Sequence, residues 1–439
     1  MILLAFAWGV HRYGSADDFR LRINAEVEAH RPHPLYAPTP LAPYVAAGIA
    51  DLAVSEMMSR ATASATPGAT PSPTATSRQE SALLDSPVQI VAPRVTAGAR
   101  QPTPTPAIPP APTPSPDFAL PAQVRLTGLR HNWQTWNNCG PATLAMNLSF
   151  FGSKLSQADV AAVLRPYRDD KNVSPEEMAA YARANGLQAS VRVNGDAERL
   201  KLLLAAGVPV LLETWYEPKP NDGMGHYRLL VGYDDAQREW IAYDSYDGRG
   251  LKKNEPYTGI RLPYDEIAKL WEAFNRTYVI LYDGARAAAV SDILGADADD
   301  TAMWAAALEK ARTTALAQPE NAFAWFNAGS TLVEMGRYED AAQMYDHARR
   351  VGLPWRMMWY QFGPFEAYYE TGRYDEVIAL ANATLRNAQI EELYYWRGLA
   401  QQAKGDVPAA RESWRRALEL NPNYAPVRER MQTLDASSP

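Results

Sequence analysis

The stretch CGPATLAMNLSFF, residues 139–151, decides how the rest of the chain is interpreted. Its apolar residues recur at helical spacing, Pro141 falls in the first turn, where proline is tolerated, and Gly152 follows as a stop signal. The stretch therefore predicts a helix that begins at a cysteine. Unpaired backbone N–H groups and the positive end of the helix dipole favour the thiolate of Cys139. The alternative is an ordinary buried cysteine.

Cys139 is the only cysteine among 439 residues. A single thiol excludes an intramolecular disulfide and a thiolate-rich zinc site. The chain holds 43 basic and 50 acidic residues, a formal net charge of -7, so it has no basic excess to neutralise a run of phosphates. We expect no nucleic-acid partner, no metal and no cofactor.

Composition divides the chain into four parts: 1–60, 61–117, 118–286 and 287–435. The second part is dominated by Pro, Thr, Ser and Ala, which predicts a disordered, extended linker. The first part opens with MILLAFAWGV, an apolar run of signal-peptide length without a basic n-region or a clear cleavage site. It is interpreted as the end of a signal or anchor, with an ordinary buried helix segment as the alternative.

Residues 118–286 predict an α+β domain. Ser174 opens a capping box with Pro175 at the first helical position. Strand-like runs follow at 187–193, 208–216, 226–233, 239–244 and 276–282, with helical runs at about 196–206 and 264–274. Helices followed by a mostly antiparallel sheet favour an α+β domain over a doubly wound one.

A nucleophilic thiol needs a base. His131 and His226 are the two histidines of residues 118–286, and His131 lies eight residues before Cys139. His226 opens a predicted strand after a Gly-Met-Gly turn, so its ring can project from the end of the sheet toward a helix N-terminus.

A carboxylate is expected beside His226. The strand that His226 opens pairs with 239–244 through a turn near 234–237, and this register places Asp244 opposite His226 to within about one residue. A carboxylate there would fix the imidazole tautomer and stabilise its cation. The order Cys139, His226, Asp244 therefore favours catalysis, although each residue taken singly has a structural explanation.

The oxyanion of such a reaction needs donors beyond the backbone N–H of Cys139. Gln134, five residues upstream, can supply a side-chain amide. Asn137 and Asn138 compete with it on spacing alone, and any of the three can simply cap the helix.

Four features of the sequence belong together. They are the string from Gln134 through Cys139-Gly-Pro-Ala, the Phe150-Phe151-Gly152 that closes the helix, Gly225-His226-Tyr227, and Tyr243-Asp244. Together they resemble the C39-like peptidases. These are papain-like thiol proteases, known best as double-glycine leader peptidase domains fused to bacterial peptide exporters. The resemblance covers 118–286 and implies a papain-like fold.

The resemblance also implies roles for four residues. Cys139 would be the nucleophile, His226 the general base and acid, Asp244 the residue that orients the imidazole, and Gln134 the oxyanion donor. Two features depart from the family pattern: Gln134 stands five residues before the cysteine instead of six, and Ser245 follows the aspartate where many relatives have proline.

Residues 287–435 predict an all-α tetratricopeptide solenoid. Gly-Arg-Tyr occurs at 336–338 and 372–374 and Gly-Asp-Val at 405–407, spacings of 36 and 33 that lie near the 34-residue tetratricopeptide period. Residues 302–318 are expected to form an additional packing helix. The middle repeat, about 358–389, is degenerate, with Phe365 where a small residue usually stands.

These observations predict an exported, extracellular or cell-surface cysteine peptidase that hydrolyses peptide or amide bonds. A membrane tether is expected at its N-terminus. The concave face of the repeats would bind a partner or substrate protein, with a purely structural cap as the alternative. Two other functions stay open: a non-catalytic peptide-binding scaffold, and a papain-like amidase or acyltransferase. The chain has no Walker-type loop, so leader removal during export is not implied.

Overall fold

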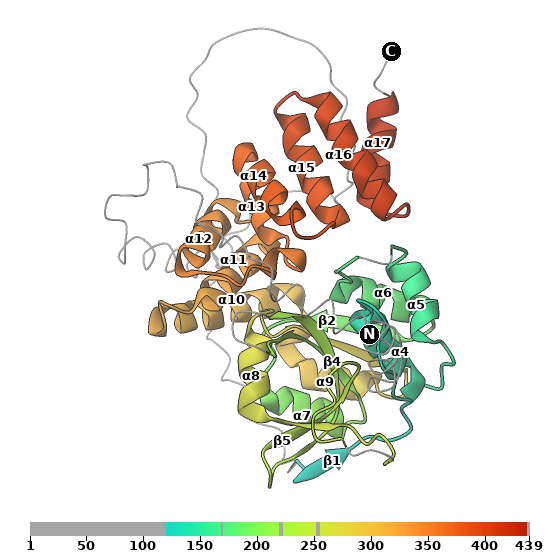
Figure 1. Cartoon of the computed structure of the whole chain (residues 1–439). Coiled ribbons are helices and arrows are strands. Elements are labelled where there is room, and N and C mark those ends of the chain that lie inside the picture. The colour runs from blue at the N-terminus through green and yellow to red at the C-terminus, as the bar shows by residue number, and fades with distance from the viewer. Residues whose placement is uncertain (1–119, 168–169, 219–222, 252–254, 437–439) are drawn as a thin grey trace, which may run out of the picture. The chain divides into compact units, whose positions relative to one another are not determined.

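The computed structural model describes residues 120–167, 170–218, 223–251 and 255–436 (Figure 1). The predicted N-terminal segment and the Pro/Thr/Ser-rich linker lie outside these residues. Among the helices of the described ranges, none combines the length and the apolar character needed to cross a membrane.

An antiparallel sheet forms the centre of the α+β domain, as predicted. Its strand order is β2-β7-β3-β4-β5-β6, and β1 pairs with β4 outside this path. The strands are β1 (Gln123–Arg125), β2 (Gln188–Arg192), β3 (Val210–Tyr216), β4 (Met224–Asp234), β5 (Glu239–Asp244), β6 (Ile260–Pro263) and β7 (Tyr278–Tyr282). The five predicted strands are confirmed, whereas the short strands β1 and β6 were not expected.

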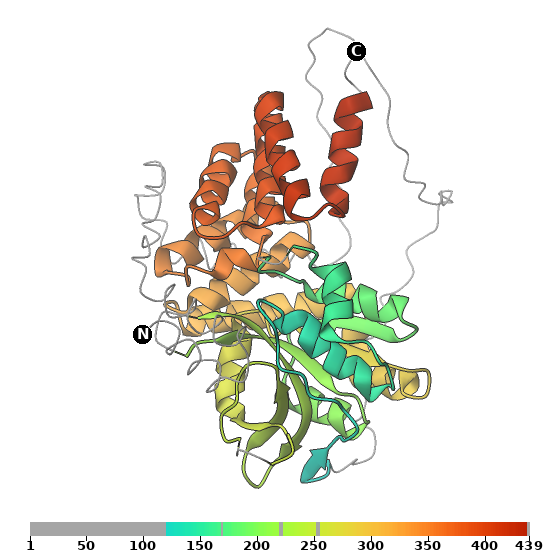
Figure 2. The ribbon, with the colours of Figure 1, turned by 45° about the vertical axis from the view of Figure 1, so that its right-hand side comes forward.

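Helices cover both faces of this sheet (Figure 2). They are α4 (Cys139–Phe150), α5 (Gln157–Leu164), α6 (Pro175–Ala184), α7 (Ala197–Ala205), α8 (Tyr264–Glu272) and α9 (Ala287–Leu294). Because side chains alternate along a strand, Leu211 of β3 packs with α4 and α6, while Val210 and Leu212 pack with α7 and α8. Both faces are apolar for this reason, and the strands appear in the sequence as nearly continuous hydrophobic runs.

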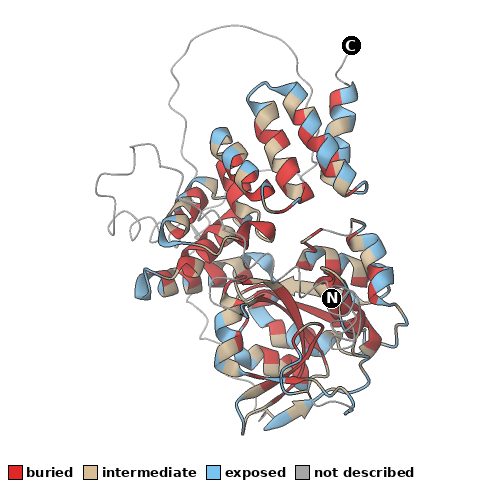
Figure 3. Ribbon diagram, in the orientation of Figure 1, coloured by how far each residue is buried: buried red, intermediate tan, exposed pale blue. Residues whose placement is uncertain are grey.

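Helix α4 is buried on almost every side. All ten residues from Gly140 to Ser149 are buried, and the burial colouring of Figure 3 shows the same for the central strands. A Cβ on Gly140 would lie 3.3 Å from the Cβ of Val173, so the first turn of α4 packs closely. A Cβ on Gly140 would also lie 3.6 Å from the ring of Tyr227, so the end of α4 where Cys139 lies packs directly against β4.

The remainder of the described chain is helical, which confirms the predicted all-α region. Its helices are α10 (Asp300–Ala317), α11 (Ala322–Glu334), α12 (Tyr338–Val351), α13 (Gly363–Glu370), α14 (Tyr374–Leu385), α15 (Glu391–Ala403), α16 (Val407–Leu420) and α17 (Ala425–Ala436). Helix α10 corresponds to the packing helix expected at 302–318. Consecutive helices pack in pairs, α11 with α12 and α15 with α16 most extensively.

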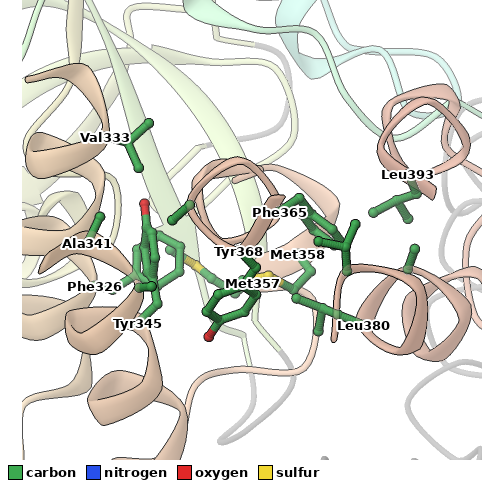
Figure 4. Close-up of a cluster of buried hydrophobic side chains, with 14 of the residues drawn as sticks. Phe326, Val333, Ala341, Tyr345, Met357, Met358, Phe365, Tyr368, Leu380 and Leu393 are labelled. Carbon is green, nitrogen blue, oxygen red and sulfur yellow. The ribbon is translucent and has the colours of Figure 1, made fainter. Parts of the chain in front are cut away.

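Glycine allows close packing within these pairs. A Cβ on Gly329 would lie 2.8 Å from the ring of Tyr345, and one on Gly398 would lie 2.3 Å from Nε1 of Trp414. The middle repeat has Phe365 instead, on the eight-residue helix α13. Figure 4 shows Phe365 among Met358, Leu380 and Leu393, where its ring fills the space between neighbouring helices.

Candidate active site

Cys139 is the first residue of α4, and Asn138 at the N-cap makes no side-chain capping bond. The thiol hydrogen-bonds His226 and accepts hydrogen bonds from the backbone N–H groups of Tyr227 and Gly140. Burial opposes ionisation of the thiol, but the hydrogen bond and charge of His226, followed by the two N–H groups, outweigh it and lower the pKa of Cys139. The site therefore favours a thiolate.

His226 lies between the thiol and a carboxylate. Its Nε2 lies 2.9 Å from Oδ1 of Asp244, and both side chains are buried. Nδ1 of His226 thus remains for the thiol. Burial alone would lower the pKa of His226, but the charge and hydrogen bond of Asp244 raise it to about 9. This arrangement favours a thiolate–imidazolium ion pair.

The expected register, with Asp244 opposite His226 to within about one residue, was wrong. The residue opposite Asp244 is Arg228, two positions from His226, because the turn pairs Asp234 with Glu239 and lies later in the chain than expected. The bulge between Leu230 and Gly232 reduces the offset from three positions to two. Residues two apart on a strand share a face, so His226 lies diagonally across from Asp244 on the same face. The predicted proximity of the two side chains is nevertheless found.

Asp244 is fixed by several donors. Its Oδ1 accepts from the backbone N–H of Tyr246 at 2.8 Å and of Asp247 at 2.7 Å, and its Oδ2 lies 3.1 Å from Nε of Arg228. Burial would raise the pKa of this carboxyl, but His226 and then Arg228 hold it well below its usual range. Asp244 therefore stays ionised beside the imidazole.

Arg228 is a site residue that the sequence interpretation missed. Its side chain is fully buried, it pairs with Asp244, and its Nη1 donates to Oγ1 of Thr214. A signal was present, because an arginine inside the otherwise apolar run HYRLLVGY requires a buried anion nearby.

His131, the other candidate base, has a different environment. Its Nε2 lies 2.8 Å from the backbone oxygen of Asp244, and its ring stacks on Tyr257 with centroids 3.4 Å apart. Burial lowers the pKa of His131. These contacts hold the loop before α4 against the end of β5, and the thiol is paired with His226 instead.

The three candidate oxyanion donors differ in their surroundings. Gln134 accepts at Oε1 from Oγ of Ser245 at 2.9 Å, which leaves its amide N–H groups as donors. Asn138 donates from Nδ2 to Oε1 of Gln157 at 2.9 Å and accepts from Arg165, so its amide is occupied away from the thiol. Asn137 borders the cavity beside Cys139.

The amide of Asn137 is held by two donors at the edge of that cavity. In the amide orientation that satisfies its neighbours, Oδ1 accepts from Nζ of Lys171 at 3.2 Å and from Nε1 of Trp136 at 2.9 Å. Gln134 stays the predicted oxyanion donor, and Asn137 is a second candidate on structural grounds.

A cavity of about 20 Å³ lies beside the thiol, with His226, Tyr227, Glu213 and Tyr360 in its wall. Glu213 was not anticipated from the sequence. Burial, and next the charges of Glu176 and Cys139, raise its pKa well above the usual range, which favours the protonated form that does not oppose the thiolate. Across the described ranges, no three His, Cys, Asp or Glu side chains gather in a way that could hold a metal.

Comparison with known families agrees with this geometry. Residues 121–279 match the model of the Peptidase_C39 like family. The chain contains a C39-like domain. Residues 324–348 and 391–424 match tetratricopeptide repeat models, so repeats follow the C39-like domain, as the sequence predicted. These matches cover α11–α12 and α15–α16, the pairs in which glycine faces a large aromatic ring.

Several solved structures are similar to the C39-like domain. They include the peptidase domain of Streptococcus ComA (15% identity, 36% of this chain, 99% of that chain, TM-score 0.27). A double glycine motif protease from an AMS/PCAT transporter, solved with the leader peptide, shows 19% identity over 36% of this chain and 92% of that chain (TM-score 0.25). Xylellain, a cysteine protease from Xylella fastidiosa, shows 18% identity over 39% of this chain and 91% of that chain (TM-score 0.26). Comparison with curated proteins gave no match.

Proposed function

We propose that this chain is an exported, tethered cysteine peptidase that hydrolyses peptide or amide bonds through Cys139, His226 and Asp244. The observation that carries the proposal is the hydrogen-bonded series from the thiol at the start of α4, through His226, to the buried carboxylate of Asp244. Each member is surrounded by groups that favour the charge it needs for nucleophilic catalysis.

The reaction follows from this series. The thiolate of Cys139 attacks the carbonyl carbon, and a C–S bond forms while the carbonyl oxygen becomes an oxyanion. The imidazolium of His226 gives its proton to the leaving nitrogen, the C–N bond breaks, and a thioester remains on the enzyme. Neutral His226 then takes a proton from water, which attacks the thioester and releases the acid and the thiolate. Gln134 or Asn137 would stabilise both oxyanions.

The deciding experiment measures how fast iodoacetamide alkylates Cys139 as a function of pH, with intact mass as the readout. Because the chain has one thiol, the product needs no assignment. We expect the rate to follow a thiolate that titrates below the free value of about 8.5, and to follow a higher pKa in His226→Ala. An ordinary thiol profile that ignores His226 would reject catalysis and favour the non-catalytic binding scaffold.

The kind of bond cleaved is part of the same proposal. Hydrolysis and acyl transfer share the thioester, so the product formed in water and the product formed with an added amine separate a peptidase from an acyltransferase. The repeats serve in this proposal as the arm that binds a partner or substrate protein.

Export and tethering rest on composition. The Pro/Thr/Ser-rich residues 61–117 would act as an extended spacer, and the apolar run at residues 1–10 would belong to a signal or anchor. We expect a tag at the C-terminus to be digested by protease added to intact producing cells. Protection of the tag until the cells are lysed would contradict a cell-surface location.

A further inference from the structure

The segment between α12 and α13 borders the catalytic cavity. Tyr360, on this segment, lines the cavity together with Cys139 and His226. Its ring lies 3.1 Å from the place where a Cβ on Gly225 would stand, directly before His226. The repeat region therefore supplies a wall of the site that holds the thiol.

Other contacts hold Tyr360 in this place. Its ring packs edge-on against Trp215, with centroids 6.3 Å apart, and lies 6.2 Å from the ring of Phe274. Arg356, buried on the same segment, donates from Nη1 to the backbone oxygen of Gly223 at 2.9 Å. Both ends of the segment 356–360 are thus fixed to the strand pair β3–β4 that presents His226.

The cavity is so small that the position of the Tyr360 ring affects which groups fit beside the thiol. A volume of about 20 Å³ holds about one water molecule. A group larger than a water molecule that enters this cavity to reach the thiol contacts the ring of Tyr360, and the cost of displacing the ring rises with the size of that group. The absence of a Cβ at Gly225 allows the ring to lie this close.

We propose that Tyr360 is a specificity-determining residue of this site, which limits the size of the group that can approach Cys139. This inference rests on the proposed function, because it concerns access to the same thiol. It assigns the repeat region a direct part in substrate selection, separate from any partner that its concave face binds.

The test compares two electrophiles that differ in size and share one reactive group, iodoacetamide and N-benzyl iodoacetamide, on the full-length chain. The quantity measured is the ratio of their alkylation rates at Cys139. We expect Tyr360→Ala to lower the preference for the small reagent by about tenfold, the lower end of what one methylene is worth in an apolar pocket. Tyr360→Phe keeps the ring and should keep the ratio.

Two further variants make the result decisive. Tyr374→Ala removes a tyrosine that packs on Tyr369 within the repeats, and it should leave the ratio unchanged. If thermal unfolding shows that Tyr360→Ala does not fold, Tyr360→Leu takes its place, with a smaller fall in the ratio in the same direction.

An unchanged ratio in a folded Tyr360→Ala or Tyr360→Leu variant overturns the inference. Failure of the proposed function would give a different result. Both reagents would then alkylate Cys139 with the pH dependence of an ordinary thiol in every variant, and the ratio of their two rates could still be measured. The two failures are therefore distinguished in one set of experiments.

Discussion

His226 and Asp244 share a face of the sheet because β4 carries one residue more than β5 between them and the turn. Asp234 pairs with Glu239 at the turn, and without the bulge at Leu230/Gly232 this register would place Leu229 opposite Asp244. Because a shift of one residue moves every side chain to the other face, His226 would then point away from Asp244. The bulge is thus part of the candidate active site.

The first prediction concerns the proton on His226. Asp244 raises the pKa of His226 to about 9, so the imidazolium should persist below that pH and be lost above it. Asp244→Asn removes the charge and should move the titration to lower pH. Nuclear magnetic resonance of labelled imidazoles measures this directly, with the signal assigned through His226→Ala. Asp265→Asn, at an exposed carboxylate, should leave the titration unchanged. An inflection near the ordinary histidine pKa of about 6.5 in the wild type would contradict the prediction.

The second prediction concerns the ion pair beneath the site. Arg228→Met should lower the free energy of unfolding by about 3 kcal/mol, the lower end for breaking a buried ion pair, because the buried carboxylate of Asp244 loses one of its two cationic partners and keeps only His226. Arg261→Met is the matched control on the same sheet: Arg261 is exposed, and its longer ion pairs with the half-buried Asp234 and Glu239 are worth about 1 kcal/mol. Urea unfolding measures both. Equal losses of unfolding free energy in the two variants would show that burial of the Arg228–Asp244 pair does not increase its contribution to stability.

Much of this fold could be predicted from the sequence, because the signals were local. The capping box at Ser174 and the apolar strand runs placed α6 and five strands correctly. Helix α5 was missed even though Ser156 and Asp159 form a capping box of the same kind. Strands β1 and β6 have three and four residues, too few to establish a periodic pattern.

The site was predicted in part for a related reason. His226 and Asp244 could be brought together by counting along one hairpin, and Cys139 was predicted from its place at the start of a helix. The bulge that fixes the relation of His226 to Asp244 was not anticipated, although Gly232 inside the strand run is a signal for one. The position of Tyr360 depends on packing between segments more than 130 residues apart. Contacts of that kind leave no trace in local composition or spacing.

The third prediction concerns the repeats. Gly398→Ala should destabilise the chain by about 1–3 kcal/mol, because the added methyl group would lie 2.3 Å from Nε1 of Trp414. Helix propensity alone would give the opposite sign, since alanine is favoured over glycine by about 1 kcal/mol within a helix. Gly284→Ala, where a Cβ meets no atom within 4 Å, is the control and should be neutral or slightly stabilising. Thermal unfolding that shows stabilisation by Gly398→Ala would refute the packing explanation.

The last prediction concerns the carboxyl groups that lie between α15 and the segment before α6. Asn172 donates from Nδ2 to Oε1 of Glu392 at 2.9 Å. Burial, followed by the charges of Glu391 and Asp170, raises the pKa of Glu392 well above its usual range, and burial likewise raises that of Asp170. A raised pKa in the folded state means that the folded chain binds protons more readily than the unfolded chain.

Stability should therefore fall as the pH rises from the ordinary carboxyl range toward the raised value. Glu392→Gln keeps an oxygen for Asn172 and removes the charge, so it should stabilise the chain at pH 8 by about 1 kcal/mol, the scale of one poorly compensated buried group. The same variant should stabilise the chain less at pH 5, because a lower pH favours the protonated form of the wild-type group. Glu412→Gln, at an exposed carboxylate, is the control. Urea unfolding at both pH values decides the matter, because destabilisation by Glu392→Gln at pH 8 would mean that the ionised carboxylate is the form that holds α15 in place.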